Sequence, residues 1–274
     1  QMQTETRTMK LLTWNVNGLG NRIKRGLVNK AVDRYGSEII FLQETQMTGN
    51  QHLSMRRGKY KVAAHSHYTS GSRGVITLFK KSLPLHIKQV RTDQRGCYAE
   101  IHGEWEGEDV LLINVYAPPG LQSSVLQEIG QLLVAMPRAL TIMGGDFNLV
   151  WDMHMYRTSR KQEGTATMGK LKGFMQAMGL MDVWRELHPD ERGYSHYSAA
   201  HNVFSRIDSL FTPQETGHRF TEAKFLARGI SDHSPLTISI QTHVRAGHRE
   251  WRMAAWHLTN RKEVDRLDEA TTLF

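Results

Sequence analysis

Residues 140–148 read LTIMGGDFN, and the fold prediction rests on this stretch. The run at 140–143 is short and largely apolar, as expected of a strand that is buried on both faces. Two glycines then lead directly to a carboxylate, Asp146, and soon after to an amide, Asn148. A polar group at the end of a buried strand is held rigidly and still reaches solvent. The stretch therefore predicts a core strand that delivers functional groups to the edge of a sheet.

Other segments of the chain repeat this pattern. Residues 38–42 (EIIFL) form a continuous apolar run, and further strands are predicted at 10–15, 74–79, 110–116 and 235–240. The later part of the chain reads as short strands separated by turns. Because strands dominate and helices are few, the order favours an α/β fold in which helices cover the outer faces of two stacked sheets.

Three helices are predicted between these strands. Residues 25–35, 123–136 and 168–178 carry apolar residues at helical spacing, with Leu27 in the stripe of the first. Ser124 is the expected N-cap of the second helix. The methionines of the third are interpreted as core filling rather than as a metal or cofactor site.

Composition narrows the classes of function. The chain has 274 residues, 39% hydrophobic and 23% charged, which is enough to build a packed core. Lys and Arg outnumber Asp and Glu by 35 to 27, and this net charge of +8 favours a polyanionic partner such as nucleic acid. No apolar stretch approaches the ~20 residues of a membrane span, so no membrane partner is expected.

The single cysteine, Cys97, excludes a disulfide framework within the chain and favours a reducing compartment. Cys97 is interpreted as a small buried residue, and a nucleophilic role is the weaker alternative.

Six short polar segments lie at or near strand ends and carry the candidate chemistry. They are WNVNG (14–18), QET (43–45), NVYAP (114–118), GGDFN (144–148), SRID (205–208) and SDHSP (231–235). Each alone has a plain structural explanation: Glu44 as a solvated strand end, the glycines before Asp146 as a turn, and His233 as a cap. The full set holds more carboxylates, amides and Asp–His pairs than turns require.

These groups suit phosphodiester hydrolysis. A hard cation such as Mg²⁺ prefers carboxylate oxygens and water, which Glu44 can help to provide, and the cation neutralises the scissile phosphate. Asp146 can orient or deprotonate an attacking water. His233, held by Asp208 or Asp232, can stabilise charge that develops on the phosphate.

The order of these motifs resembles the exonuclease–endonuclease–phosphatase superfamily, which includes deoxyribonuclease I and the apurinic/apyrimidinic endonucleases, over about residues 10–240. The resemblance implies a four-layered, deoxyribonuclease-I-like α/β sandwich, with two stacked, mainly antiparallel sheets flanked by helices. It implies a metal group of Glu44, Asn15 and Asp232, binding Mg²⁺ with Mn²⁺ able to substitute. It implies that the catalytic residues are Asn15, Glu44, Tyr116, Asp146, Asn148, Asp208, Asp232 and His233, with Tyr116 on the scissile phosphate and Asp208 orienting His233.

A narrower resemblance is to the endonucleases of LINE-type retrotransposons. It rests on NVNGL (15–19), IKR (23–25), QET (43–45), and YS (194–195) followed by SRID (205–208). One departure is Pro119, where many relatives carry Asn. In this family the segment matching 196–204 is a hairpin that enters the DNA groove. The expected DNA-binding residues are Arg157, Ser195, His196, Tyr197, His201, Asn202, Phe204 and Ser205.

The resemblance implies an endonuclease domain at 9–242, an N-terminal extension at 1–8, and an extension or linker at 243–274 toward a reverse transcriptase. The expected activity is a nick in one strand of double-stranded DNA that leaves a 3′-hydroxyl to prime reverse transcription in the nucleus. Two alternatives stay open: a phosphatase of the same superfamily, acting on phosphoinositides or nucleotides, and a catalytically inactive DNA-binding module.

Overall fold

Two six-stranded sheets stack face to face in the computed structural model, which describes residues 6–55, 58–69, 72–136, 139–151, 155–158 and 165–243. The first, sheet A, has the order β13-β14-β1-β2-β4-β3, and the second, sheet B, has the order β5-β6-β7-β8-β12-β9. The strands of sheet A are β1 (Thr6–Asn15), β2 (Ile39–Gln43), β3 (Tyr60–Ser66), β4 (Val75–Lys80), β13 (Phe220–Phe225) and β14 (Leu236–His243). Those of sheet B are β5 (Leu85–Thr92), β6 (Tyr98–Trp105), β7 (Glu108–Tyr116), β8 (Leu140–Asp146), β9 (Leu180–Asp182) and β12 (Asp208–Pro213).

Each sheet contains one parallel pair among antiparallel neighbours. β1 runs parallel to β2, and β7 runs parallel to β8. The carboxyl ends of parallel neighbours meet at one sheet edge. The next strand beyond each pair is antiparallel: β14 lies beside β1, and β12 lies beside β8. The amino ends of β12 and β14 therefore meet the carboxyl ends of the parallel pairs at the same edge.

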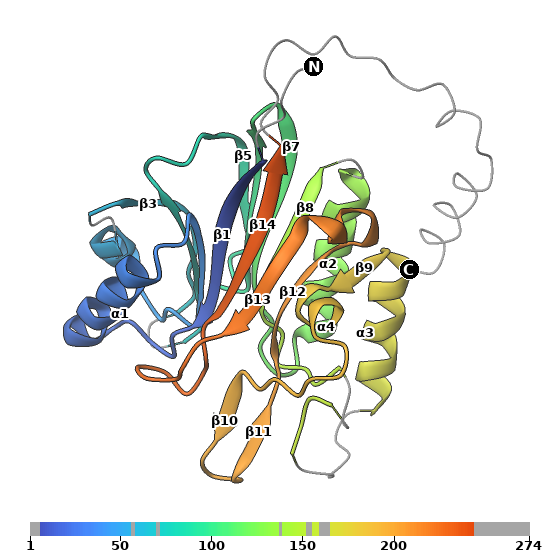
Figure 1. The fold of residues 1–274 in the computed structure, drawn as a ribbon. Coiled ribbons are helices and arrows are strands. Elements are labelled where there is room, and N and C mark those ends of the chain that lie inside the picture. The colour runs from blue at the N-terminus through green and yellow to red at the C-terminus, as the bar shows by residue number, and fades with distance from the viewer. Residues whose placement is uncertain are drawn as a thin grey trace.

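Helices cover both outer faces, as Figure 1 shows, with α1 (Arg22–Tyr35) on one side and α2 (Gln122–Ala135) and α3 (Thr165–Ala177) on the other. The remaining elements are α4 (Val183–Leu187), the 3-10 segments η1 (Gly49–Met55) and η2 (Gln214–Arg219), and a two-stranded hairpin of β10 (His196–Ser198) and β11 (Val203–Ser205). The sandwich fold expected from the sequence is confirmed.

Three hydrophobic clusters separate the four layers. Side chains from both sheets, such as Phe41 and Leu112, fill the space between them. Ile40 and Leu42 point the other way and pack with α1. Successive residues of a strand face opposite sides, so a strand that is buried on both faces must be apolar throughout. This explains the apolar run IIFL at 39–42. Phe174 of α3 packs in the third cluster, between sheet B and its helices.

Some local expectations were wrong. The first helix begins at Arg22 rather than 25, because the side chain of Asn21 caps it by accepting from the backbone N–H groups of Ile23 and Lys24. Leu27 lies on the exposed face of that helix, at 46% exposure. Ser124 does not cap α2, since its hydroxyl donates to the carbonyl of Leu121 inside the first turn.

The domain limits also shift slightly. Residues 6–8, expected in an extension, pair with β14 and belong to β1, and β14 extends to residue 243. The expected extension at 244–274 lies outside the described residues.

Cys97 is fully buried, as expected, and burial together with the nearby Asp93 raises the pKa of its thiol to about 12. Within the part of the chain that the structure describes, no helix is long and apolar enough to cross a membrane.

Gly145 explains why the chain needs glycine just before Asp146. Its φ is 152°, and a Cβ placed there would lie 1.8 Å from the carbonyl oxygen of Val115. Any side chain would therefore push β8 away from β7 at the point where β8 delivers Asp146.

Candidate active site

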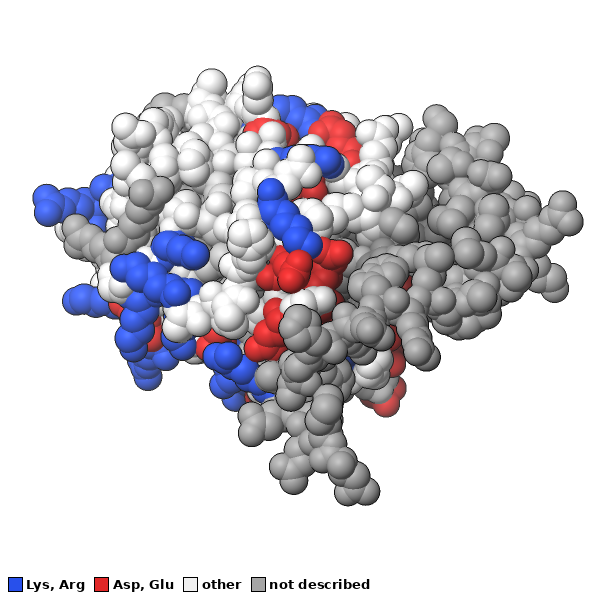
Figure 2. Space-filling view, turned by 90° about the horizontal axis from the view of Figure 1, so that it is seen from above, with Lys and Arg blue, Asp and Glu red and all other residues white. Residues whose placement is uncertain are grey.

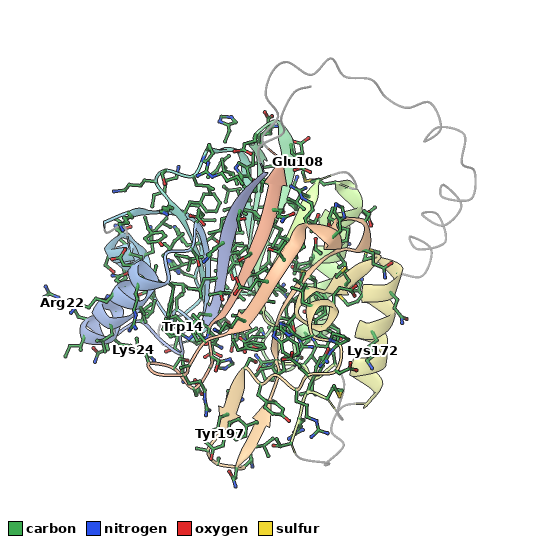
Figure 3. All side chains as sticks on the ribbon, viewed as in Figure 1. Trp14, Arg22, Lys24, Glu108, Lys172 and Tyr197 are labelled. Carbon is green, nitrogen blue, oxygen red and sulfur yellow. The ribbon has the colours of Figure 1, made fainter. Side chains whose placement is uncertain are left out.

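The candidate catalytic residues converge at the shared edge of the two sheets. Asn15 ends β1 and Glu44 follows β2, while Tyr116 and Asp146 end the paired strands β7 and β8. The antiparallel neighbours add Asp208 at the start of β12 and His233 just before β14. Figure 3 shows this edge at the end of the molecule where Trp14, Lys24 and Tyr197 lie, with Glu108 at the opposite end.

The amide of Asn15 joins carboxylates from the two sheets. Its Nδ2 donates to Glu44 Oε1 at 2.9 Å and to Asp146 Oδ2 at 2.8 Å. Its Oδ1 accepts from the backbone N–H of Asn17 at 2.9 Å, which fixes the direction in which the amide points. Asn15 and Asp146 are completely buried, and Glu44 is half-buried, so Glu44 faces the solvent side of this network.

Two of the expected catalytic residues, Glu44 and Asn148, adopt a left-handed backbone conformation. Glu44 has a φ of 49° and Asn148 a φ of 51°. Asparagine tolerates this region, but for glutamate it costs ~1–2 kcal/mol. The conformation turns the chain sharply at the end of β2, where backbone hydrogen bonds from Gly18 to Glu44 and from Thr45 to Gly74 hold it.

Asp208 and His233 form a buried pair. His233 Nδ1 lies 2.7 Å from Asp208 Oδ2, and the exposures of the two side chains are 6% and 2%. Burial disfavours the charged imidazole, but attraction to Asp208 and a hydrogen bond donated to its carboxylate, with smaller contributions from Asp146 and Asp232, raise the pKa of His233 to about 10. His233 is therefore an imidazolium at neutral pH, with Nε2 left to donate toward a substrate.

The buried Asp146 lies directly across the sheet from Asp208. Burial and the charge of Asp208 raise the pKa of Asp146, while His233 and hydrogen bonds from Asn148 and Asn15 oppose the rise. A carboxylate with a raised pKa is a better proton acceptor at neutral pH than an ordinary aspartate. The backbone N–H of Asn148 donates to Asp146 Oδ1 at 2.9 Å, and its side-chain amide lies beside the same carboxylate.

Tyr116 lies beside both carboxylates. Burial, followed by the charges of Glu44 and Asp146, raises the pKa of its hydroxyl well above the usual range. Tyr116 therefore remains a neutral hydrogen-bond donor at any physiological pH, as a contact to a phosphate oxygen requires.

Asp232 lies on the same loop as His233 but on its exposed side. Its Oδ1 accepts from Asn17 Nδ2 at 3.1 Å, and its Oδ2 lies 3.6 Å from His196 Nε2. The hydrogen bond from His196 is the main cause that holds the pKa of Asp232 well below its usual range. Ser231 ties the loop to β1, because its hydroxyl donates to the carbonyl of Asn15 at 2.8 Å.

Three residues of this network were missed in the sequence: Asn17, Lys24 and Ser231. Lys24 Nζ donates to the carbonyl of Asn17 at 2.6 Å. Burial lowers the pKa of Lys24 against the attraction of Asp232 and Glu44. Asn17 and Lys24 lie within the NVNGL and IKR motifs, and Ser231 within SDHSP. Nothing in their residue types distinguishes them from ordinary polar residues of loops and helix surfaces.

The hairpin of β10 and β11 projects from this edge (Figure 1). His201 and Asn202 are exposed at its turn, and Tyr197 and Phe204 lie half-buried with their rings 4.7 Å apart. Arg228 lies over both rings, at 4.9 and 5.1 Å from their centres. The hairpin expected at 196–204 is thus confirmed as a structural element, with an aromatic and cationic surface beside the site.

The base of the hairpin is fastened to the catalytic loop. The His196 ring contacts that of His233 in a tilted arrangement, with ring centroids 4.6 Å apart, and the Tyr197 backbone N–H donates to the Asp232 carbonyl. Arg157 pairs with the backbone of Ser205, which places it next to the hairpin as well. Ser205 is largely buried, with its hydroxyl 3.5 Å from His196 Nδ1.

Ser195 differs from its expected role as a DNA contact. It is completely buried, and its hydroxyl accepts from the backbone N–H groups of Ile207 and Asp208 at 3.0 Å each. Ser195 lies just before β10, and its hydroxyl is turned into the protein toward the start of β12. Ser195 therefore positions Asp208 instead of touching a ligand at the surface.

The residues present fit a hard divalent cation. Glu44 is a carboxylate held in place at the solvent side of the network. Both Glu44 and Asp232 attract the ammonium of Lys24, so the negative charges of the two carboxylates act on the same region. Mg²⁺ is typically held by one or two carboxylates together with water and substrate phosphate. Among the described residues, Asp232 groups with His196 and His233, and Asp146 with Asp208 and His233, while Glu44 joins no such three-residue group. Glu44 could hold such a cation as a single carboxylate ligand, with water and substrate phosphate as the other ligands.

Comparison with known proteins agrees with this geometry. Residues 12–233 match the Endonuclease/Exonuclease/phosphatase family, and the chain belongs to that family. It is 24% identical over 258 residues to the Transposon TX1 uncharacterized 149 kDa protein of Xenopus laevis, covering 92% of this chain but only 19% of that protein. It is 26% identical over 260 residues to the Exodeoxyribonuclease of Bacillus subtilis, covering 85% of this chain and 99% of that enzyme.

Solved structures confirm the fold. The AP endonuclease LMAP from Leishmania major superposes with a TM-score of 0.71 at 17% identity, covering 86% of this chain and 88% of that one. The Xenopus laevis APE2 catalytic domain gives a TM-score of 0.68 at 19% identity, covering 88% and 94%. The chain thus belongs to a family of endonucleases, exonucleases and phosphatases, and it is similar to an exodeoxyribonuclease over most of its length.

We expect Asp208→Asn to lower the pKa of His233 by at least about one pH unit, because the variant loses the attraction that outweighs burial. Ring NMR titration in metal-free buffer measures this directly. A raised folded-state pKa adds stability below the unfolded value of roughly 6.5, and this stability is lost as the pH rises through the folded pKa. The cost of the variant should therefore be largest in acid. The exposed Asp190→Asn is the control, and an unchanged His233 midpoint in Asp208→Asn would contradict the assignment.

Proposed function

We propose that this chain is the endonuclease part of a LINE-type retrotransposon protein. It nicks one strand of double-stranded DNA with Mg²⁺ and leaves a 3′-hydroxyl that primes reverse transcription. The observation that carries the nuclease chemistry is the continuous network from Glu44 through Asn15 and Asp146 to the Asp208–His233 pair. The alignment with a transposon protein over 92% of this chain supports the biological setting.

In the proposed reaction, Asp146 accepts the proton of the attacking water, because its raised pKa suits it to do so near neutral pH. The Asn148 side chain helps to orient that water. His233 donates a hydrogen bond to the phosphate oxygen on which charge develops, and Asp208 keeps the imidazole charged and correctly turned. Tyr116 donates a second hydrogen bond from its neutral hydroxyl. Glu44 would hold a cation that would supply charge neutralisation at the scissile phosphate, and the departing 3′-oxygen would take its proton from water.

Double-stranded DNA is the proposed substrate. The net charge of +8 favours a polyanion. The face opposite the site shows basic side chains on the side of α1 and acidic ones near its centre (Figure 2), so the basic charge is not spread evenly. At the site itself the hairpin adds Arg228, Tyr197 and Phe204. Such a surface suits contacts to phosphates and sugars. Its aromatic rings also suit insertion between the bases of a flexible step.

The retrotransposon setting also implies a fused reverse transcriptase and action in the nucleus. Both belong to the proposal, and the 19% share of the transposon protein that this chain spans leaves room for such further domains in that relative.

Glu44→Ala should reduce nicking of supercoiled plasmid in Mg²⁺ by at least ~10²-fold while the fold survives, because the main metal carboxylate is lost. Gel quantification of relaxed circles, with and without EDTA, measures the loss. Glu215→Ala, an exposed carboxylate in η2, should nick normally. Retained nicking by Glu44→Ala would remove Glu44 from this role. A wild-type chain that releases phosphate from nucleotides or phosphoinositides without nicking DNA would be a phosphatase, and one that does neither would be a binding module.

Replacing only the hairpin turn at 199–202 should change the pattern of cut sites in a random-sequence library, and the rate of metal-dependent hydrolysis should stay within about tenfold. The exchange is limited to the turn because His196 and Tyr197 contact the catalytic loop. Exchanging the β6–β7 turn at 106–107, at the far end of the sheet, is the matched control. An unchanged cut pattern with activity retained would show that the hairpin does not select the target.

A further inference from the structure

Three histidines gather outside the catalytic residues. His52 belongs to η1, His65 to β3, and His67 follows directly after β3. One ring nitrogen from each lies within 4.8 Å of the other two. His65 and His67 are two residues apart on an extended chain and so lie on one side of it, toward η1. Two separate segments of the chain therefore deliver imidazoles to one point.

One pair of ring nitrogens is spaced as two ligands of a metal ion would be. His67 Nε2 lies 3.3 Å from His52 Nδ1. Two ligands in a tetrahedral site with metal–nitrogen bonds of 2.0–2.1 Å are about 3.3 Å apart. The rings stack, with centroids 3.8 Å apart for His52 and His65 and 4.5 Å apart for His65 and His67. Metal binding requires these rings to rotate about χ2 so that their lone pairs converge.

The surroundings support neutral, oriented imidazoles. His52 Nδ1 also lies 3.0 Å from the carbonyl oxygen of Gly49, a contact that metal binding at this nitrogen would replace. The Nδ1 atom of His67 is buried and makes no hydrogen bond within the described part of the chain. Burial, aided by the nearby His52, lowers the pKa of His67, which favours the neutral form that binds metals.

The cluster is separate from the catalytic network. β3 is the edge strand of sheet A, and β4 lies between it and β2, which Glu44 follows. Two strand spacings are roughly 10 Å. His52 is 9% exposed and the other two rings are half-buried, so solvent can still reach the cluster.

We propose that His52, His65 and His67 form a second metal site, which takes a borderline transition-metal ion such as Zn²⁺ with water as the fourth ligand. Three imidazoles select Zn²⁺, Cu²⁺ or Ni²⁺ over Mg²⁺, which prefers oxygen. Bound metal clamps η1 to the edge strand β3 and thereby stabilises the rim of the sheet beside the catalytic edge.

Calorimetric titration of the full chain with Zn²⁺, after removal of any affinity tag, tests the site. The wild-type protein should bind one equivalent at this site. His65→Ala and His67→Ala should each weaken that binding by at least ~10²-fold, because losing a ligand costs more than losing its supporting contact. The exposed His86→Ala and the catalytic-site variant Glu44→Ala should retain it. Zn²⁺ should also raise the Tm of the wild type but not that of His65→Ala.

X-ray absorption of the Zn²⁺-loaded wild type provides a test that needs no variant, and it should show three imidazole ligands. Zn²⁺ binding that is unchanged in both His65→Ala and His67→Ala would overturn the proposal. So would loss of the equivalent in Glu44→Ala, or the absence of any binding below about 1 mM. Each of these outcomes leaves the nuclease proposal untouched, because DNA nicking is not the readout.

Discussion

The hydrogen bonds from the Asn15 amide to Glu44 and Asp146 join the two sheets at the edge where the site forms. Each carboxylate follows or ends a strand of a different sheet, and a buried carboxylate left without a partner is costly. The same amide accepts from the backbone of Asn17, so its orientation is fixed by β1 itself. The distance between Glu44, at the proposed metal position, and Asp146, at the proposed water position, thus depends on how the two sheets stack.

The second constraint is the loop that carries Asp232 and His233. It is tied to β1 through Ser231 and to the hairpin through His196 and the backbone of Tyr197. A substrate that moves the hairpin therefore acts directly on the loop that holds the imidazolium. For the proposed DNA substrate, this is a physical route by which the shape of the duplex would influence the rate of cleavage without contact to the reacting atoms.

The layers of the fold and the strand-end residues could be predicted because burial on both faces leaves an unbroken apolar run, as at 38–42 and 140–143. The glycine before Asp146 is visible in the sequence. The reason for it, the close approach of the Val115 carbonyl, follows only from the pairing of β7 with β8. Ser195 was misjudged because its neighbours in sequence face the surface while it points inward. The contacts of Asn17 and Ser231 join segments more than 200 residues apart, which no local pattern encodes.

The central claim is that Asp146 and His233 act on one transition state as parts of a single network. Single-turnover nicking rates of Asp146→Ala, His233→Ala and the double variant, in saturating Mg²⁺, test it most directly. Each single change should reduce the rate by at least ~10², and the double variant should be little slower than the worse single one. Losses that multiply in full in the double variant would contradict the account, because they would mean that the two groups act independently.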